Sequence, residues 1–201
     1  MASFCSNWSV LLYLQKMKSL QLHKPHVLVV VGLPGAGKTF FATQFSETFS
    51  APYLDYGHYR QLVGDETTAD KLADDTLTQL LRTKQTIIVE GRGSKHSDRR
   101  ELVKLAHKSG YDTMFVWVQT EPVTAEQRSV RSKSARMTAN EFDQRAAEFE
   151  ILTRTEPYLV ISGKHTYPSQ AKIVLKKLVA GRTATSPEIT RIVPPRGRIM
   201  G

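Results

Sequence analysis

The stretch that decides the fold is Gly32-Leu33-Pro34-Gly35-Ala36-Gly37-Lys38-Thr39, which matches the pattern G-x-x-x-x-G-K-[ST] at every fixed position. It follows the apolar run 27–31, which is typical of a strand buried on both faces, and it precedes a helical pattern over 39–49. Glycines in such a loop allow consecutive backbone N–H groups to surround a phosphate, and the new helix adds its partial positive N-terminus. The stretch therefore predicts a nucleotide-binding loop between a strand and a helix.

The residue types in this loop indicate how a nucleotide would be held. The Lys38 ammonium is expected to reach the β- and γ-phosphates, and the Thr39 hydroxyl is expected to bind Mg²⁺. The residues expected to contact the nucleotide are Gly32, Pro34, Gly35, Ala36, Gly37, Lys38, Thr39 and Phe40. ATP and Mg²⁺ are therefore the expected cofactors, although the loop alone does not distinguish ATP from GTP.

Apolar runs alternate with helical patterns along the rest of the chain. Further strands are predicted over 52–54, 86–89, 113–118 and 158–161. Further helices are predicted over 58–63, 68–82, 98–107, 123–131, 139–149 and 169–179. Because strands that alternate with helices form parallel sheets, we expect a three-layer α/β domain over residues 25–180. Its sheet should be mainly parallel and five-stranded, with helices on both faces.

The positive charge of the chain is unevenly distributed. The 201 residues include 28 Lys plus Arg and 19 Asp plus Glu, which gives a formal net charge of +9. Residues 1–24 hold three lysines and no acid, and residues 181–201 hold four arginines and one glutamate. We interpret the first segment as an N-terminal extension, in which Met17 is an alternative start, and the second as a basic flexible tail. The remainder is only mildly basic, which argues against a long polynucleotide track.

Composition also excludes several classes of protein. The single cysteine, Cys5, excludes a disulfide framework and a metal site built from cysteines. No apolar run approaches the roughly 20 residues that a membrane-spanning helix needs. The apolar run 10–13 is too short for a secretory signal. We therefore expect a cytoplasmic protein that does not act at a membrane.

Two acids and two basic stretches lie where predicted strands end. Asp55 follows the strand 52–54, and Glu90 follows the strand 86–89. The first basic stretch comes after Glu90 and holds Arg92, Lys95, Arg99 and Arg100. The second comes after the strand 113–118 and holds Arg128, Arg131 and Arg136. Because parallel strands end at one edge of a sheet, these residues are expected near the phosphate loop.

The order of these motifs resembles the P-loop kinases of the polynucleotide-kinase-like group, in the AAA-type ATPase and kinase family. The resemblance covers about residues 26–180. The stretch Tyr56-Gly57-His58-Tyr59-Arg60-Gln61 is similar to the D-D-Y-R-Q stretch of phage-type polynucleotide kinases. Aligning Tyr59-Arg60-Gln61 places Gly57 where that family has an aspartate, and Asp55 lies two residues earlier.

The resemblance implies transfer of the γ-phosphoryl group of ATP to a hydroxyl. It implies that Asp55 takes the proton of that hydroxyl and that Glu90, with Thr39, binds Mg²⁺. It also implies a mobile lid over 124–136 whose arginines act on the transferring group. The predicted catalytic residues are Lys38, Asp55, Arg128, Arg131 and Arg136. The alternatives are a helix N-cap for Asp55, a buried structural acid for Glu90 and an ordinary basic helix for the lid.

The acceptor is the least defined part of this prediction. Arg60, Arg92 and Arg99 are expected to bind an acceptor phosphate, and the alternative is a solvated basic surface. Candidate acceptors are a nucleic-acid 5′ end, a nucleoside or a small metabolite. Two other functions remain open, an ATPase or nucleotide switch that acts through protein partners and a toxin-like sugar-nucleotide kinase. Asp98 is also expected to cap the helix 98–107 in a capping box with Glu101.

Overall fold

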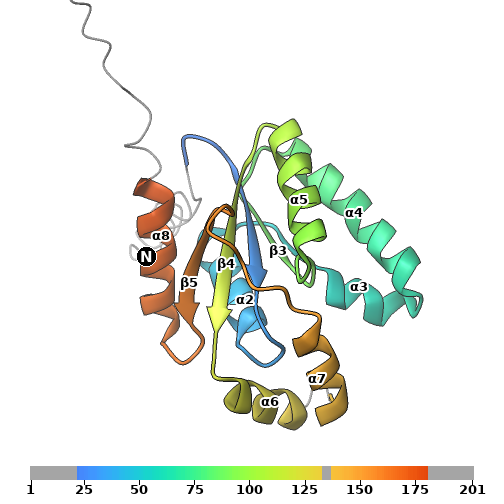
Figure 1. Cartoon of the computed structure of the whole chain (residues 1–201). Helices are drawn as coiled ribbons and strands as arrows, with labels where there is room; N and C mark the ends of the chain where they lie inside the picture. Colours follow the sequence, from blue (N-terminus) through green and yellow to red (C-terminus); the bar gives the residue numbers. More distant parts are fainter. Residues whose placement is uncertain (1–21, 133–136, 181–201) are drawn as a thin grey trace, which may run out of the picture.

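The computed structural model describes residues 22–132 and 137–180 (Figure 1). Its sheet has the order β2-β3-β1-β4-β5, and every neighbouring pair of strands is parallel. The strands are β1 (His26–Val31), β2 (Tyr53–Asp55), β3 (Ile87–Glu90), β4 (Asp112–Gln119) and β5 (Tyr158–Ser162). The predicted parallel five-stranded sheet is confirmed. Most of the predicted extension and the whole predicted tail lie outside the described residues.

Helices cover both faces of the sheet because its central strands are apolar on both sides. On one face, α2 (Lys38–Phe49) and α8 (Tyr167–Ala180) pack against Leu28 and Val30 of β1. On the other face, α4 (Glu66–Arg82) and α5 (His96–Lys108) pack against the alternate β1 residues 27, 29 and 31. The three layers predicted from the alternation of strands and helices are therefore present.

The remaining helices lie at the end of the sheet to which the strands point. In Figure 1 the strand arrowheads point toward the end where α6 (Pro122–Arg131) and α7 (Ala139–Ala147) lie. The phosphate loop, 32–37, joins β1 to α2, and α3 (Tyr56–Val63) follows β2 without a connecting loop. The fold therefore brings the loop, the acids at the strand ends and the arginine-rich helix α6 to one edge.

Helices α3, α4, α5 and α8 each begin two residues before the predicted start, and at α5 this changes the cap. The predicted capping box of Asp98 and Glu101 does not form, because α5 begins two residues earlier, at His96. The His96 N–H is bound instead by Glu150 Oε2, at 2.5 Å. A carboxylate from the segment after α7 thus replaces the local cap. This contact could not be predicted because the two residues lie far apart in the sequence. Across the described residues, no helix is long and apolar enough to cross a membrane.

Candidate active site

The phosphate loop is held in shape by its own lysine. Lys38 Nζ donates to the carbonyl oxygen of Leu33 over 2.9 Å, so the side chain lies across the loop. Burial lowers the pKa of the Lys38 ammonium, although the carboxylates of Glu90 and Asp55 oppose this. A phosphate in the loop would supply the negative charge that this buried ammonium lacks.

The Glu90 carboxylate joins the phosphate loop to the edge strand. Its Oε1 accepts a hydrogen bond from Thr39 Oγ1 over 2.8 Å, and its Oε2 accepts one from Tyr53 over 2.7 Å. The residue is only 6% exposed. Burial raises the pKa of the Glu90 carboxyl, and Lys38 and the two hydroxyl groups oppose this only in part. Burial also raises the pKa of Tyr53, so its hydroxyl remains a donor.

Asp55 and Glu90 are aligned at the ends of neighbouring parallel strands. They are register partners in the pairing of β2 with β3. Asp55 Oδ1 accepts a hydrogen bond from the Gly57 N–H over 2.8 Å and so caps α3. The cap predicted as an alternative is therefore present, and it uses the Oδ1 oxygen of Asp55.

The residue types at this edge fit Mg²⁺. Thr39 and Glu90 provide a hydroxyl oxygen and a carboxylate oxygen at hydrogen-bond distance from each other. Mg²⁺ prefers oxygen ligands and in kinases is held by one or two protein groups together with phosphates of the substrate. Within the described residues, no group of three or more His, Cys, Asp or Glu side chains could hold a metal alone. The donor set thus suits an ion that arrives with a nucleotide.

Helix α6 of the predicted lid lies directly on the phosphate loop. Gly35 has φ +70°, and a Cβ atom there would overlap the carbonyl oxygen of Ala125 in α6. Glycine is therefore required at this position both by the backbone conformation and by the helix above it. Arg128 Nη1 donates to the carbonyl oxygen of Gly163 over 3.1 Å, which keeps this arginine beside the loop.

The other lid arginines have different positions. Arg131 is exposed at the end of α6, and Arg136 lies outside the described residues. Arg145 of α7, which the sequence analysis did not select, lies near enough to Lys38 for its positive charge to lower the lysine pKa. The structure therefore adds Arg145 to the candidate residues of the lid.

Arg60 and Arg92 lie near the strand ends but are paired with acids. Arg60 binds Asp70 through Nε at 2.8 Å and Nη2 at 2.9 Å. Arg92 forms an ion pair with Asp74 and a second one with Glu101 at 3.1 Å. Both arginines are thus paired with acids of α4, which differs from the solvated basic surface given as the alternative to acceptor binding.

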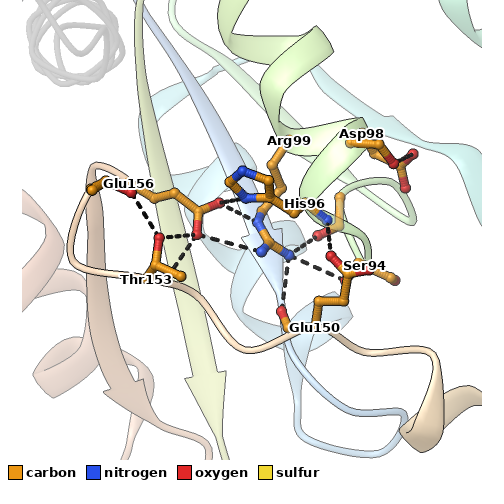
Figure 2. A network of polar contacts seen from close by, with 10 residues as sticks. Ser94, His96, Asp98, Arg99, Glu150, Thr153 and Glu156 are labelled. Carbon is orange, nitrogen blue, oxygen red and sulfur yellow. Dashed lines mark hydrogen bonds and ion pairs between the residues drawn. The ribbon is translucent and has the colours of Figure 1, made fainter.

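Arg99 has a different environment from the one expected of an acceptor-binding residue. Figure 2 shows its guanidinium among Glu156, Ser94 and the backbone of Glu150. Its Nε donates to Glu156 Oε1 over 2.5 Å, and its side chain is only 1% exposed. The contacts join the loop after β3 to the segment between α7 and β5. Arg99 is therefore a buried residue with structural contacts. It does not share a binding position with Arg60 and Arg92.

A cavity of about 520 Å³ opens beside the edge strand. Thr39 and Asp55 both line it, so it adjoins a candidate metal ligand and the candidate base. The remaining lining residues come from β2, α3, α4 and the residue before β2: Pro52, Tyr53, Leu54, His58, Tyr59, Thr76 and Leu80. Its size lies within the range of about 300–1,000 Å³ that is common for small-molecule sites.

Comparison with known proteins identifies the family. Residues 27–152, more than half of the chain, match the family model described as an AAA domain. The chain belongs to the AAA domain family. Together with the fold, this confirms the predicted membership of the P-loop kinase-like group. Among curated proteins, none matches this AAA domain protein in sequence.

Solved structures share the fold of this AAA domain. A proposed kinase from Chloroflexus aurantiacus is 17% identical, with a TM-score of 0.64 over 79% of this chain and 98% of that one. A gluconokinase from Sinorhizobium meliloti is 15% identical, with a TM-score of 0.58 over 78% and 93%. A chain of the Pnkp1/Rnl/Hen1 RNA repair complex is 18% identical, with a TM-score of 0.55 over 66% and 46%. At these identities the similarity shows the fold alone.

Sequence reasoning missed several residues of this AAA domain site. Tyr53 was treated only as part of a strand, and its bond to Glu90 depends on which strands are neighbours. The acids of α4 had a readable signal, because Glu66, Asp70 and Asp74 are four residues apart and share one helix face. Their arginine partners could be found only from the packing of α4 against α3 and β3.

Proposed function

We propose that this AAA domain transfers the γ-phosphoryl group of Mg²⁺-ATP to a hydroxyl group. One observation carries the proposal. Glu90, which binds Thr39 of the phosphate loop, is the register partner of Asp55, and a cavity lined by both Thr39 and Asp55 adjoins them. A metal side, a candidate base and room for an acceptor therefore lie at one edge of the sheet.

The phosphate loop would bind and orient the nucleotide. Lys38 would exchange its bond to the Leu33 carbonyl for bonds to the β- and γ-phosphate oxygens. Thr39 and Glu90 would hold Mg²⁺, which when bound neutralises charge on those oxygens. Because Tyr53 binds the other oxygen of Glu90, the carboxylate is oriented before a nucleotide arrives.

Asp55 would act on the acceptor. Its Oδ2 takes the proton of the acceptor hydroxyl while the new oxygen–phosphorus bond forms and the bond between the β- and γ-phosphates breaks, releasing ADP. The Gly57 N–H, bound to Oδ1, fixes the direction of the carboxylate. General-base assistance typically contributes about 10²–10⁴-fold, and less where the transition state is loose.

The lid would stabilise charge on the transferring group. Arg128 is held beside the phosphate loop through Gly163, and Arg145 acts on Lys38 electrostatically. An arginine at the equatorial oxygens of the phosphoryl group would lower the barrier, because negative charge is spread there in the transition state. Arg131 and Arg136 remain candidates for the same task.

The chemical class of the reaction is better supported than the acceptor. The relatives in structure include a gluconokinase and a chain of an RNA repair complex, so they do not favour one kind of hydroxyl compound. Nucleic-acid 5′ ends, nucleosides and small metabolites remain candidate acceptors.

The proposal is tested with γ-labelled ATP and a panel of these acceptors. Transfer to at least one of them is expected, and Lys38→Ala should abolish most of it while the protein stays folded. Asp55→Asn should lower kcat far more than nucleotide affinity. ATP turnover that no acceptor changes, but that a protein partner stimulates, would contradict the proposal and favour a nucleotide-dependent switch.

A further inference from the structure

The cavity beside β2 provides one carboxylate and no strong cation to an acceptor. Among the described residues that line it, none is a lysine or an arginine, and the carboxylate is that of Asp55. Tyr53, His58 and Tyr59 contribute rings, and Leu54 and Leu80 contribute apolar side chains. A lining of this kind suits a flat, uncharged group that bears a hydroxyl at the Asp55 end.

Arg60 and Arg92, two of the arginines expected on the acceptor side, are already paired with acids. Asp70 holds Arg60 through two hydrogen bonds, and Glu66 lies 3.3 Å from the same guanidinium. The hydrogen bond from Arg60 to Asp70 raises the pKa of the guanidinium, and burial opposes this. The pair is therefore a strong two-point contact with a fixed geometry.

Arg92 is restrained in the same way but by more groups. Its guanidinium binds Asp74 and Glu101, donates to the Tyr56 hydroxyl over 3.2 Å and lies 5.5 Å from the centre of the Tyr56 ring. The side chain is 20% exposed. Moving it to an acceptor anion would break these contacts and leave Asp74 without its cation.

The helix α4 thus supplies a row of acids that neutralises the positive charge of Arg60 and Arg92. Glu66, Asp70 and Asp74 lie on one face of α4, toward Arg60 and Arg92. An anionic acceptor would lie beside Asp55 and these paired arginines. Neither guanidinium would be free to form an ion pair with it. A like charge beside Asp55 would instead oppose its binding.

We propose that the acceptor is an uncharged, ring-bearing hydroxyl compound of the nucleoside class, which binds in the cavity beside β2 with its hydroxyl at Asp55. This inference rests on the proposed phosphoryl transfer and names the acceptor of that same site. It departs from the sequence-based expectation of a terminal phosphate bound by Arg60, Arg92 and Arg99.

The first experiment compares two acceptors that share a base and a 5′-hydroxyl, one uncharged and one with a phosphate at the 3′ position. Wild-type protein is given γ-labelled ATP with a nucleoside or with the 3′-monophosphate of that nucleoside, which offers the same 5′-hydroxyl. The kcat/KM for the nucleoside should exceed that for its phosphate by about tenfold or more. A preference for the phosphate would overturn the inference while it supports phosphoryl transfer. Absence of transfer to every acceptor in the panel would overturn the proposed function and the inference with it.

The second experiment removes the acidic partner of each arginine in turn. Asp70→Asn removes the partner of Arg60, and Asp74→Asn removes a partner of Arg92. Each change should shift the kcat/KM ratio toward the phosphorylated acceptor, with the KM for ATP unchanged. Asp75→Asn is the matched control, because Asp75 is an exposed acid of the same helix. An unchanged ratio in both variants would contradict the role assigned to the ion pairs. The wild-type comparison remains decisive if a variant fails to fold.

Discussion

The Tyr53 hydroxyl donates to Glu90 Oε2 over 2.7 Å, while Thr39 of the phosphate loop binds Glu90 Oε1 over 2.8 Å. Hydrogen bonds from the edge strand and from the phosphate loop therefore orient the same buried carboxylate. Because Tyr53 also lines the cavity beside β2, it connects the proposed metal-binding carboxylate with the proposed acceptor cavity.

Replacing Tyr53 tests this connection. Tyr53→Phe removes one donor from a buried carboxylate, so we expect weaker Mg²⁺-dependent binding of ATP and a loss of stability of about 1–3 kcal/mol. Nucleotide titrations with and without Mg²⁺ measure the first effect, and urea unfolding measures the second. Tyr59→Phe is the control, since Tyr59 also lines the cavity but its hydroxyl is paired with Thr76. Equal effects of the two changes would argue against a particular role of Tyr53.

The contact of α6 with the phosphate loop predicts what a methyl group added at Gly35 would do to α6. Gly35→Ala should displace α6, because the new Cβ atom would overlap the Ala125 carbonyl oxygen. Hydrogen exchange of α6 should rise, and ATP affinity should fall. Gly64→Ala is the matched control, because Gly64 has a similar φ of +77° but no neighbouring atom within 4 Å. Both variants bear a left-handed strain of about 1–2 kcal/mol, so a rise in α6 hydrogen exchange that occurs only in Gly35→Ala reports the overlap.

The arginines of the lid should differ from other exposed arginines of the protein. Arg145→Ala or Arg128→Ala should lower kcat by roughly 10³-fold or more if that arginine contacts the transferring group. Stability should change little, because both side chains are exposed. Steady-state kinetics with ATP and an active acceptor provide the measurement. Arg82→Ala, at the exposed end of α4, is the control. Near-normal kcat in both variants would exclude Arg128 and Arg145 from this task and leave Arg131 and Arg136 as the candidates.

The buried pair of Arg99 and Glu156 predicts a dependence of stability on pH. Burial acts to raise the pKa of Glu156, but the hydrogen bonds from Arg99 and Thr153 outweigh it and leave the pKa below its ordinary value of 4.5. The pair therefore stabilises the fold above about pH 4.5, and this contribution is lost as the pH falls through the lowered pKa.

Glu156→Gln tests this prediction. At pH 7 the variant should be about 3–5 kcal/mol less stable than the wild type, because it leaves the Arg99 charge buried without its partner. The difference should shrink as the pH falls below about 4.5 toward the lowered pKa of wild-type Glu156, because protonation removes the charge that pairs with Arg99. Urea unfolding at pH 7 and pH 3 measures both values, with exposed Glu148→Gln as the control. A difference that is constant with pH would contradict the predicted shift.

Much of the fold could be predicted because its signals are local. The apolar run 27–31 and the glycine loop after it specify β1, the turn and α2 without reference to any distant residue. The regular spacing of Phe41, Phe45 and Phe49 predicts the buried face of α2, where successive ring centroids lie 5.3 and 4.6 Å apart. The start of α5 could not be predicted, because its cap comes from Glu150, more than fifty residues away.

The sequence by itself determined the parallel α/β class, the phosphate loop and the acids that end β2 and β3, because strand periodicity and glycine spacing are properties of short segments. The tertiary structure alone decided which charges meet. Arg60, Arg92 and Arg99 look equivalent in the sequence, yet the first two pair with acids of α4 and the third is buried against Glu156. Coulombic attraction depends on distance in space and on burial, and these distances are fixed only when α4, α5 and the segment before β5 pack against the sheet.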